Sequence, residues 1–75
     1  PATGSVRVDY SLNDATAIQI SVLDVMGKTM LSTKLEKQAL GTHTQEINLN
    51  GLSSGIYFMR LRSNEGSTLK RFVIN

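Results

Sequence analysis

Residues 16–23 read Thr-Ala-Ile-Gln-Ile-Ser-Val-Leu, and this stretch decides the class of fold. Its apolar side chains Ile18, Ile20 and Val22 return at every second position, which is the period of a β-strand and not that of a helix. All three are β-branched residues, which are enriched in strands. The stretch therefore predicts a strand with one apolar face and one polar face.

The same alternation continues on both sides of this stretch, and no part of the chain has the pattern of a helix. Glycine, asparagine and aspartate separate the alternating segments, as expected of turns. Short strands roughly 8 to 12 residues apart are typical of an all-β, immunoglobulin-like or fibronectin-like antiparallel β-sandwich of about six to seven strands. A small barrel is the alternative fold. The expected strands lie at about 6–12, 16–23, 28–36, 42–48, 56–61 and 68–74.

The apolar content of these strands indicates where each one lies. The polar strand at 28–36 is expected at a sheet edge, followed by a connection at 37–41. The strand at 56–61 is apolar on both faces and is expected at the centre, with Tyr57 in the core. Leu52, in the turn-rich link before this strand, is expected to close one end of the sandwich.

The composition fits one small globular domain over residues 1–75. The chain has 40% apolar residues, 19% charged residues and a net charge of +2. A chain of this length buries only about 60% of its unfolded surface, so the core is thin. No run approaches the roughly 20 apolar residues of a membrane-spanning helix. Because the chain begins at Pro1 and not at Met, we expect it to be excised from a larger secreted protein.

The sequence lacks the patterns of catalytic and metal-binding sites. It has no cysteine and no Gly-x-Ser-x-Gly motif, and His43 is its only histidine. Its carboxylates are scattered, and Asp24 is expected to cap a turn and not to bind calcium. The eight basic residues form no cluster, and four aromatic side chains are too few for a base-stacking surface. We therefore expect no enzyme, no cofactor, no metal site and no nucleic acid partner.

Three segments of the sequence form a recognisable combination. They are Val22-Leu23-Asp24-Val25-Met26-Gly27-Lys28, then Leu52-Ser53-Ser54-Gly55-Ile56-Tyr57, then the basic and apolar end from Lys70 to Asn75. In order, spacing and position they resemble the C-terminal sorting domain of cargo exported by the type IX secretion system of Bacteroidetes, over nearly the whole chain. The positions that match the recurrent features of that family are Asp24, Gly27, Lys28, Gly55, Tyr57, Lys70, Arg71, Phe72, Val73 and Ile74.

This resemblance implies a function in protein secretion. It implies a domain at the far end of a larger protein, with the cargo on its N-terminal side, that directs the cargo across the outer membrane through a translocon. A cell-surface sortase then removes the domain, and the cargo is attached to an anionic lipopolysaccharide. The implied path runs through the periplasm to the outer membrane, the cell surface or the medium.

The amino-terminal end departs from the pattern of the family. Members normally open with an Asn-Pro segment that leads into the first strand, and here only Pro1 and Ala2 stand in its place. If a strand is missing, the sheet exposes unpaired backbone groups. A homodimer formed by strand pairing or strand exchange is then expected.

The last strand, at 68–74, supports recognition without reference to the family. Its apolar end follows Lys70 and Arg71, so its main chain can add to the sheet edge of a receptor while the charges set the register. The same residues could instead complete the domain's own sandwich, and the sequence leaves their facing open. The alternative function is a fibronectin-like structural or adhesive accessory module of a secreted protein. A sorting domain must end the native protein at Asn75, whereas such a module continues past it.

Overall fold

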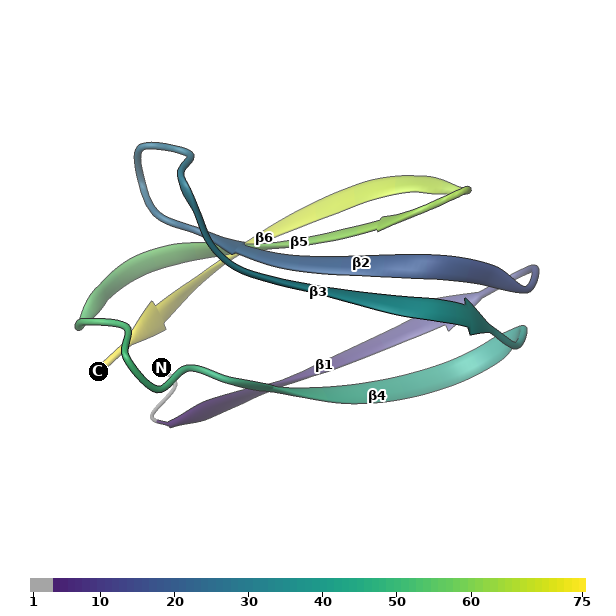
Figure 1. Cartoon of the computed structure of the whole chain (residues 1–75), viewed down its shortest axis with the longest axis horizontal. Coiled ribbons are helices and arrows are strands. Elements are labelled where there is room, and N and C mark those ends of the chain that lie inside the picture. The colour runs from purple at the N-terminus through teal and green to yellow at the C-terminus, as the bar shows by residue number, and fades with distance from the viewer. Residues whose placement is uncertain (1–3) are drawn as a thin grey trace.

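The computed structural model describes residues 4–75, which form six β-strands and no helix (Figure 1). In that range there is accordingly no helix of the length and apolarity needed to cross a membrane. The predicted all-β class is confirmed. The strands are β1 Ser5–Leu12, β2 Thr16–Leu23, β3 Thr29–Gln38, β4 Gly41–Asn48, β5 Gly55–Ser63 and β6 Gly66–Ile74.

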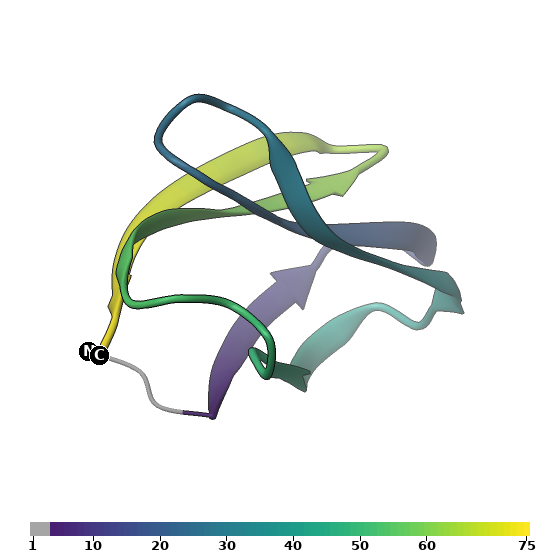
Figure 2. The ribbon, with the colours of Figure 1, turned by 60° about the vertical axis from the view of Figure 1, so that its left-hand side comes forward.

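The strands form two antiparallel sheets that pack face to face (Figures 1 and 2). One sheet has two strands, β1 and β4, and the other has four strands in the order β3-β2-β5-β6. The chain crosses between the sheets after β1, after β3 and after β4, and it stays within one sheet at the β2–β3 and β5–β6 hairpins. Among the described residues β1 does not pair with β6, so the fold is the predicted sandwich and not the alternative barrel.

The hydrophobic core lies between the two sheets, where the strand alternation directs one face of each strand inward. Ile18, Ile20 and Val22 of β2 are the centre of this core and are almost completely buried. The remaining buried members come from β1, β4, β5, β6 and the β4–β5 link: Tyr10, Leu12, Ile47, Leu49, Tyr57, Met59 and Ile74. Leu52 packs half-buried against them, as predicted for the end of the sandwich.

The strand positions inferred from apolar content are confirmed, although one connection was wrongly predicted. β3 and β6 are the edges of the larger sheet, and β5 lies inside it. The predicted connection at 37–41 is too long, because β3 continues to Gln38, which pairs with Thr16 of β2. The exposed polar side chains of an edge strand resemble those of a loop, which explains the error. Only Ala39 and Leu40 separate β3 from β4.

Candidate functional site

The Asp24 carboxylate organises the turn between β2 and β3. One oxygen, Oδ1, accepts hydrogen bonds from the backbone N–H groups of Met26 and Lys28, both at 2.9 Å. The backbone closes the same turn, since Asp24 N–H donates to the Lys28 carbonyl and Gly27 N–H donates to the Asp24 carbonyl. Asp24 is thus a turn-capping residue, as the sequence predicted.

Gly27 and Lys28 have different relations to this turn. Gly27 has a φ of +87°, a left-handed conformation that glycine adopts without steric cost. Lys28 enters the turn only through its backbone, and its exposed side chain forms no hydrogen bond or ion pair among residues 4–75. The Asp-x-x-Gly part of the motif is therefore explained by local backbone geometry, and the lysine side chain is not.

Tyr57 ties the start of β5 to the preceding link. The residue is 5% exposed, and its hydroxyl donates a 2.8 Å hydrogen bond to the carbonyl of Ser53. A tyrosine that bonds back to the backbone a few residues upstream is a recurrent device in β-sandwiches. Gly55 begins this strand with a φ of +152°, and a Cβ there would lie 3.9 Å from the Tyr57 ring. Both residues therefore fix the entry into β5, and Tyr57 is a core residue as predicted.

The terminal strand β6 turns one face inward and keeps one edge open. Ile74 pairs with Gly55 and is buried, and Phe72 pairs with Tyr57, with the two ring centroids 6.1 Å apart. The facing left open by the sequence is therefore settled, because Phe72 and Ile74 point into the sandwich. The intervening Val73 lies on the outer face. Beyond β6, no strand of residues 4–75 pairs with its other edge.

A groove follows the seam where the unpaired edges of β1 and β6 face each other. It contains two adjoining hollows of about 270 and 340 Å³, which share Val8, Asp9, Met59 and Lys70 in their walls. Phe72 lines the first hollow. The groove is open because, in the described range 4–75, β1 pairs only with β4, and β6 only with β5. The sequence did not predict this groove, because the pattern of single strands does not reveal which strand edges remain unpaired.

The three sequence motifs converge at one end of the molecule. The β2–β3 turn follows Leu23, which pairs with Phe58 near the start of β5, and Gly55 at that start pairs with Ile74 at the end of β6. Figure 1 shows this end together with the C-terminus. The motif side chains do not form one compact cluster. Lys28 is exposed in the turn, and Arg71 lies on the outer face of the sheet, where it is the cross-strand partner of Phe58.

His43 forms structural contacts and not the contacts of a catalytic dyad. Its Nε2 lies 2.6 Å from the carbonyl of Ala39, so this nitrogen carries the proton and donates to the β3–β4 turn. Its ring stacks on Tyr10 with centroids 5.4 Å apart. Among residues 4–75 no group of three histidine, aspartate or glutamate side chains is placed to hold a metal ion.

A scan against known protein families matches the family described as "secretion system C-terminal sorting domain" over residues 1–75. This chain belongs to that family. Domains of this family are the C-terminal signals that sort cargo proteins for type IX secretion in Bacteroidetes, which confirms the resemblance and the predicted function. The sorting domain stands C-terminal to a cargo, engages the type IX machinery and directs export across the outer membrane. A search of curated proteins found no match.

The hydrogen bonds of Asp24 predict the stability of the turn. Asp24→Ala is expected to lower the free energy of unfolding by about 1 to 2 kcal/mol, because two backbone N–H groups lose their acceptor. Asp24→Asn keeps an oxygen at the same place and should restore more than half of that loss. Urea denaturation measures both effects, with Asp14→Ala as the control, expected within about 0.5 kcal/mol of wild type. An asparagine variant as unstable as the alanine variant would contradict this account.

Tyr57 and Tyr10 allow a matched comparison of two buried hydroxyls. Tyr57→Phe removes the donor to the Ser53 carbonyl and is expected to lower the free energy of unfolding by about 1 kcal/mol. Tyr10→Phe is expected to leave it unchanged or to raise it, since the Tyr10 hydroxyl is buried without a hydrogen-bond partner among residues 4–75. Equal losses in the two variants, measured by urea denaturation, would show that the Ser53 bond contributes nothing specific.

Proposed function

We propose that β6 is the segment of the sorting domain that the outer-membrane translocon reads, by adding a strand to its open edge. The observation that carries the proposal is the position of β6 at the edge of the four-stranded sheet, with no neighbour beyond it among residues 4–75. An edge strand offers a row of free N–H and C=O groups, which is the basis of recognition by strand addition.

The side chains of β6 support this role because some of them hold the strand on the core while others are exposed to a partner. Phe72 and Ile74 pack against the core and hold the strand in place. Lys70 and Arg71 are exposed and lie on opposite sides of the sheet, so both charges are accessible when a second strand pairs with β6. We infer that they set the register and direction of that strand. The strand thus completes its own sandwich and remains available to a partner.

The remaining motif positions receive roles from their contacts. We propose that Asp24, Gly27, Gly55 and Tyr57 act by holding the fold that presents β6, and that Lys28 contacts the export machinery directly. We also propose that residues 1–75 act as one domain without catalysis of their own. The cargo, on the N-terminal side, passes through the periplasm with the domain, and a cell-surface sortase then removes the domain before the cargo is attached at the surface.

The decisive experiment is export of a reporter in a bacterium with an active type IX system. A periplasmic reporter fused to residues 1–75 is expected to reach the surface, and deletion of Lys70 to Asn75 is expected to abolish its export. Because the deletion also removes core contacts, Lys70→Glu provides a variant that leaves the core intact. It is expected to reduce the surface fraction about tenfold, whereas Lys37→Glu on β3 should not. Full export of both the deletion and Lys70→Glu would refute the proposal.

The open edges also support a homodimer of the isolated domain, by pairing or exchange of strands. Both β1 and β6 have an edge that is unpaired within residues 4–75. Pro1 and Ala2, on which the expectation of a missing strand rested, lie outside the described residues. Light scattering over a range of protein concentrations is expected to show a mass that rises towards twice that of the chain. A monomeric mass at every concentration would exclude the dimer.

A further inference from the structure

The outer face of the four-stranded sheet carries apolar and basic side chains in a regular arrangement. The strand registers align its outward residues in rows across the sheet, at right angles to the strands. The row nearest the β2–β3 turn end is Ile56 and Val73; the next rows are Leu23, Phe58 and Arg71, then Ser32, Ser21, Arg60 and Leu69, then Lys34, Gln19, Arg62 and Ser67. The face is thus apolar at one end and basic at the other.

These rows contain four cations and no acid. Within residues 4–75 no acid forms an ion pair with these four cations. Asp24 is bound to the amides of its own turn, and Glu65 accepts hydrogen bonds from the backbone of Asn13 and Asp14. Glu36 lies on β3 beyond the last row, where the β2–β3 register is irregular. The only ion pair among residues 4–75, between Arg7 and Asp9, lies on the other sheet.

The outer face of the two-stranded sheet is different in kind. Its outward residues alternate with the core residues of β1 and β4 and are all polar. They include both signs of charge, with Arg7 beside Asp9 and opposite Glu46. The two outer faces therefore differ in charge: the rows of the four-stranded sheet carry cations alone, whereas the two-stranded sheet carries both signs.

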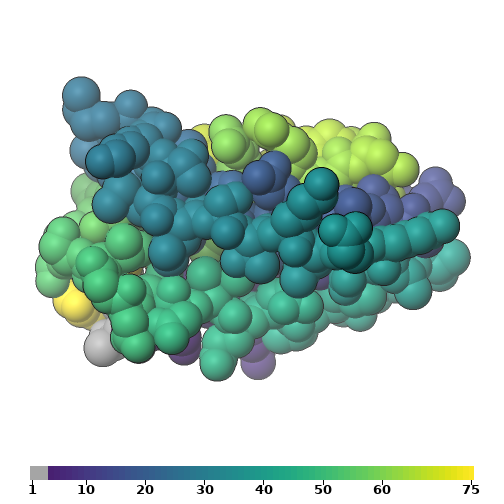
Figure 3. Space-filling model, in the orientation of Figure 1, coloured from purple at the N-terminus to yellow at the C-terminus, as the bar shows by residue number. Residues whose placement is uncertain are grey.

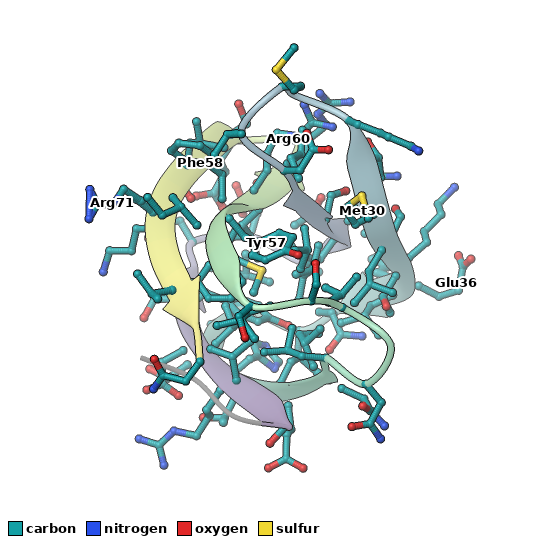
Figure 4. The ribbon with its side chains drawn as sticks, turned by 90° about the vertical axis from the view of Figure 1, so that its left-hand side faces the viewer. Met30, Glu36, Tyr57, Phe58, Arg60 and Arg71 are labelled. Carbon is teal, nitrogen blue, oxygen red and sulfur yellow. The ribbon has the colours of Figure 1, made fainter. Side chains whose placement is uncertain are left out.

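We infer that the outer face of the four-stranded sheet, which we call the basic face, is a second docking surface of the sorting domain, for an acidic protein surface. The inference rests on the proposed function, because it places the partner in the export machinery. Phe58, Arg60 and Arg71 project from this face, on the side of β5 and β6 away from Tyr57 (Figure 4). Aromatic residues and arginine are the side chains most enriched at the centres of protein interfaces.

The shape of the face favours a protein over a membrane. Three of the four cations are arginines, whose planar guanidinium groups pair in bidentate fashion with carboxylates and also with phosphates, so the choice between the two partners rests on shape. The β2–β3 turn stands above the face as a rim, with Val25 64% and Met26 87% exposed (Figures 1 and 3). A flat bilayer resting on this rim would be held away from Phe58, whereas a shaped protein surface can reach it.

The test uses the reporter fusion with residues 1–75 and a matched pair of variants. Arg60→Gln with Arg62→Gln removes two charges from the basic face, and Arg7→Gln with Lys37→Gln removes two exposed charges elsewhere. We expect the first pair to lower the surface fraction about tenfold and the second to change it less than about twofold. Lys34→Gln changes an exposed side chain on β3 and is expected to lower export while the melting temperature stays unchanged. A lower export in this variant therefore cannot be attributed to unfolding of the domain.

The outcomes separate this inference from its alternatives. Normal export of both Arg60→Gln/Arg62→Gln and Lys34→Gln overturns it. Sedimentation of the wild-type fusion with phosphatidylcholine–phosphatidylglycerol vesicles, lost in Arg60→Gln/Arg62→Gln, would identify a lipid site and also overturn it. If deletion of Lys70 to Asn75 leaves export intact, it is the proposed role of β6 that fails. If the deletion blocks export while the basic-face variants do not, only the present inference fails.

Discussion

Two strands must cover four in this sandwich, and that mismatch sets most of its other properties. Neighbouring strands lie about 4.8 Å apart, so the β1–β4 sheet is too narrow to cover the inner face of β3-β2-β5-β6. It covers the central strands β2 and β5, whose inward apolar residues are buried apart from the half-buried Leu61. At the margins the cover is incomplete, and Leu31 and Leu35 of β3 and Phe72 of β6 are only half-buried. The groove between β1 and β6 has the same cause, because the narrow sheet does not reach across to β6.

The family positions differ in how they relate to this constraint. Asp24, Gly27, Gly55 and Tyr57 satisfy backbone groups or backbone conformations at one end of the large sheet, where the thin core leaves few other contacts to hold the turns. A motif can thus recur in a family because it is needed for folding, without touching any partner. The exposed side chain of Lys28, at the same end, forms no hydrogen bond or ion pair within residues 4–75. This lack of a role in the fold is the physical reason to propose that it takes part in recognition.

The sequence predicted the elements well and their surfaces poorly. Period-two alternation located all six strands, and the apolar strand at 56–61 and the polar strand at 28–36 were placed correctly as centre and edge, because burial is a property of single strands. The groove and the basic face depend on pairing registers between strands far apart in sequence. Arg60 and Lys34 become members of one surface only because β2 joins their strands. A one-residue slip in either register would turn these side chains to the other face.

A signal built from an edge and a face differs from a linear peptide, because neither exists in the unfolded chain. The four strands of the basic face come from two segments, 16–38 and 55–74. The free edge of β6 exists only after β5 has paired with the opposite edge of β6. If these are the features that the export machinery reads, recognition reports that the domain has folded. The small core then has a consequence for function, since any loss of stability in the Asp24 turn or at Tyr57 would lower the fraction of chains that present the signal.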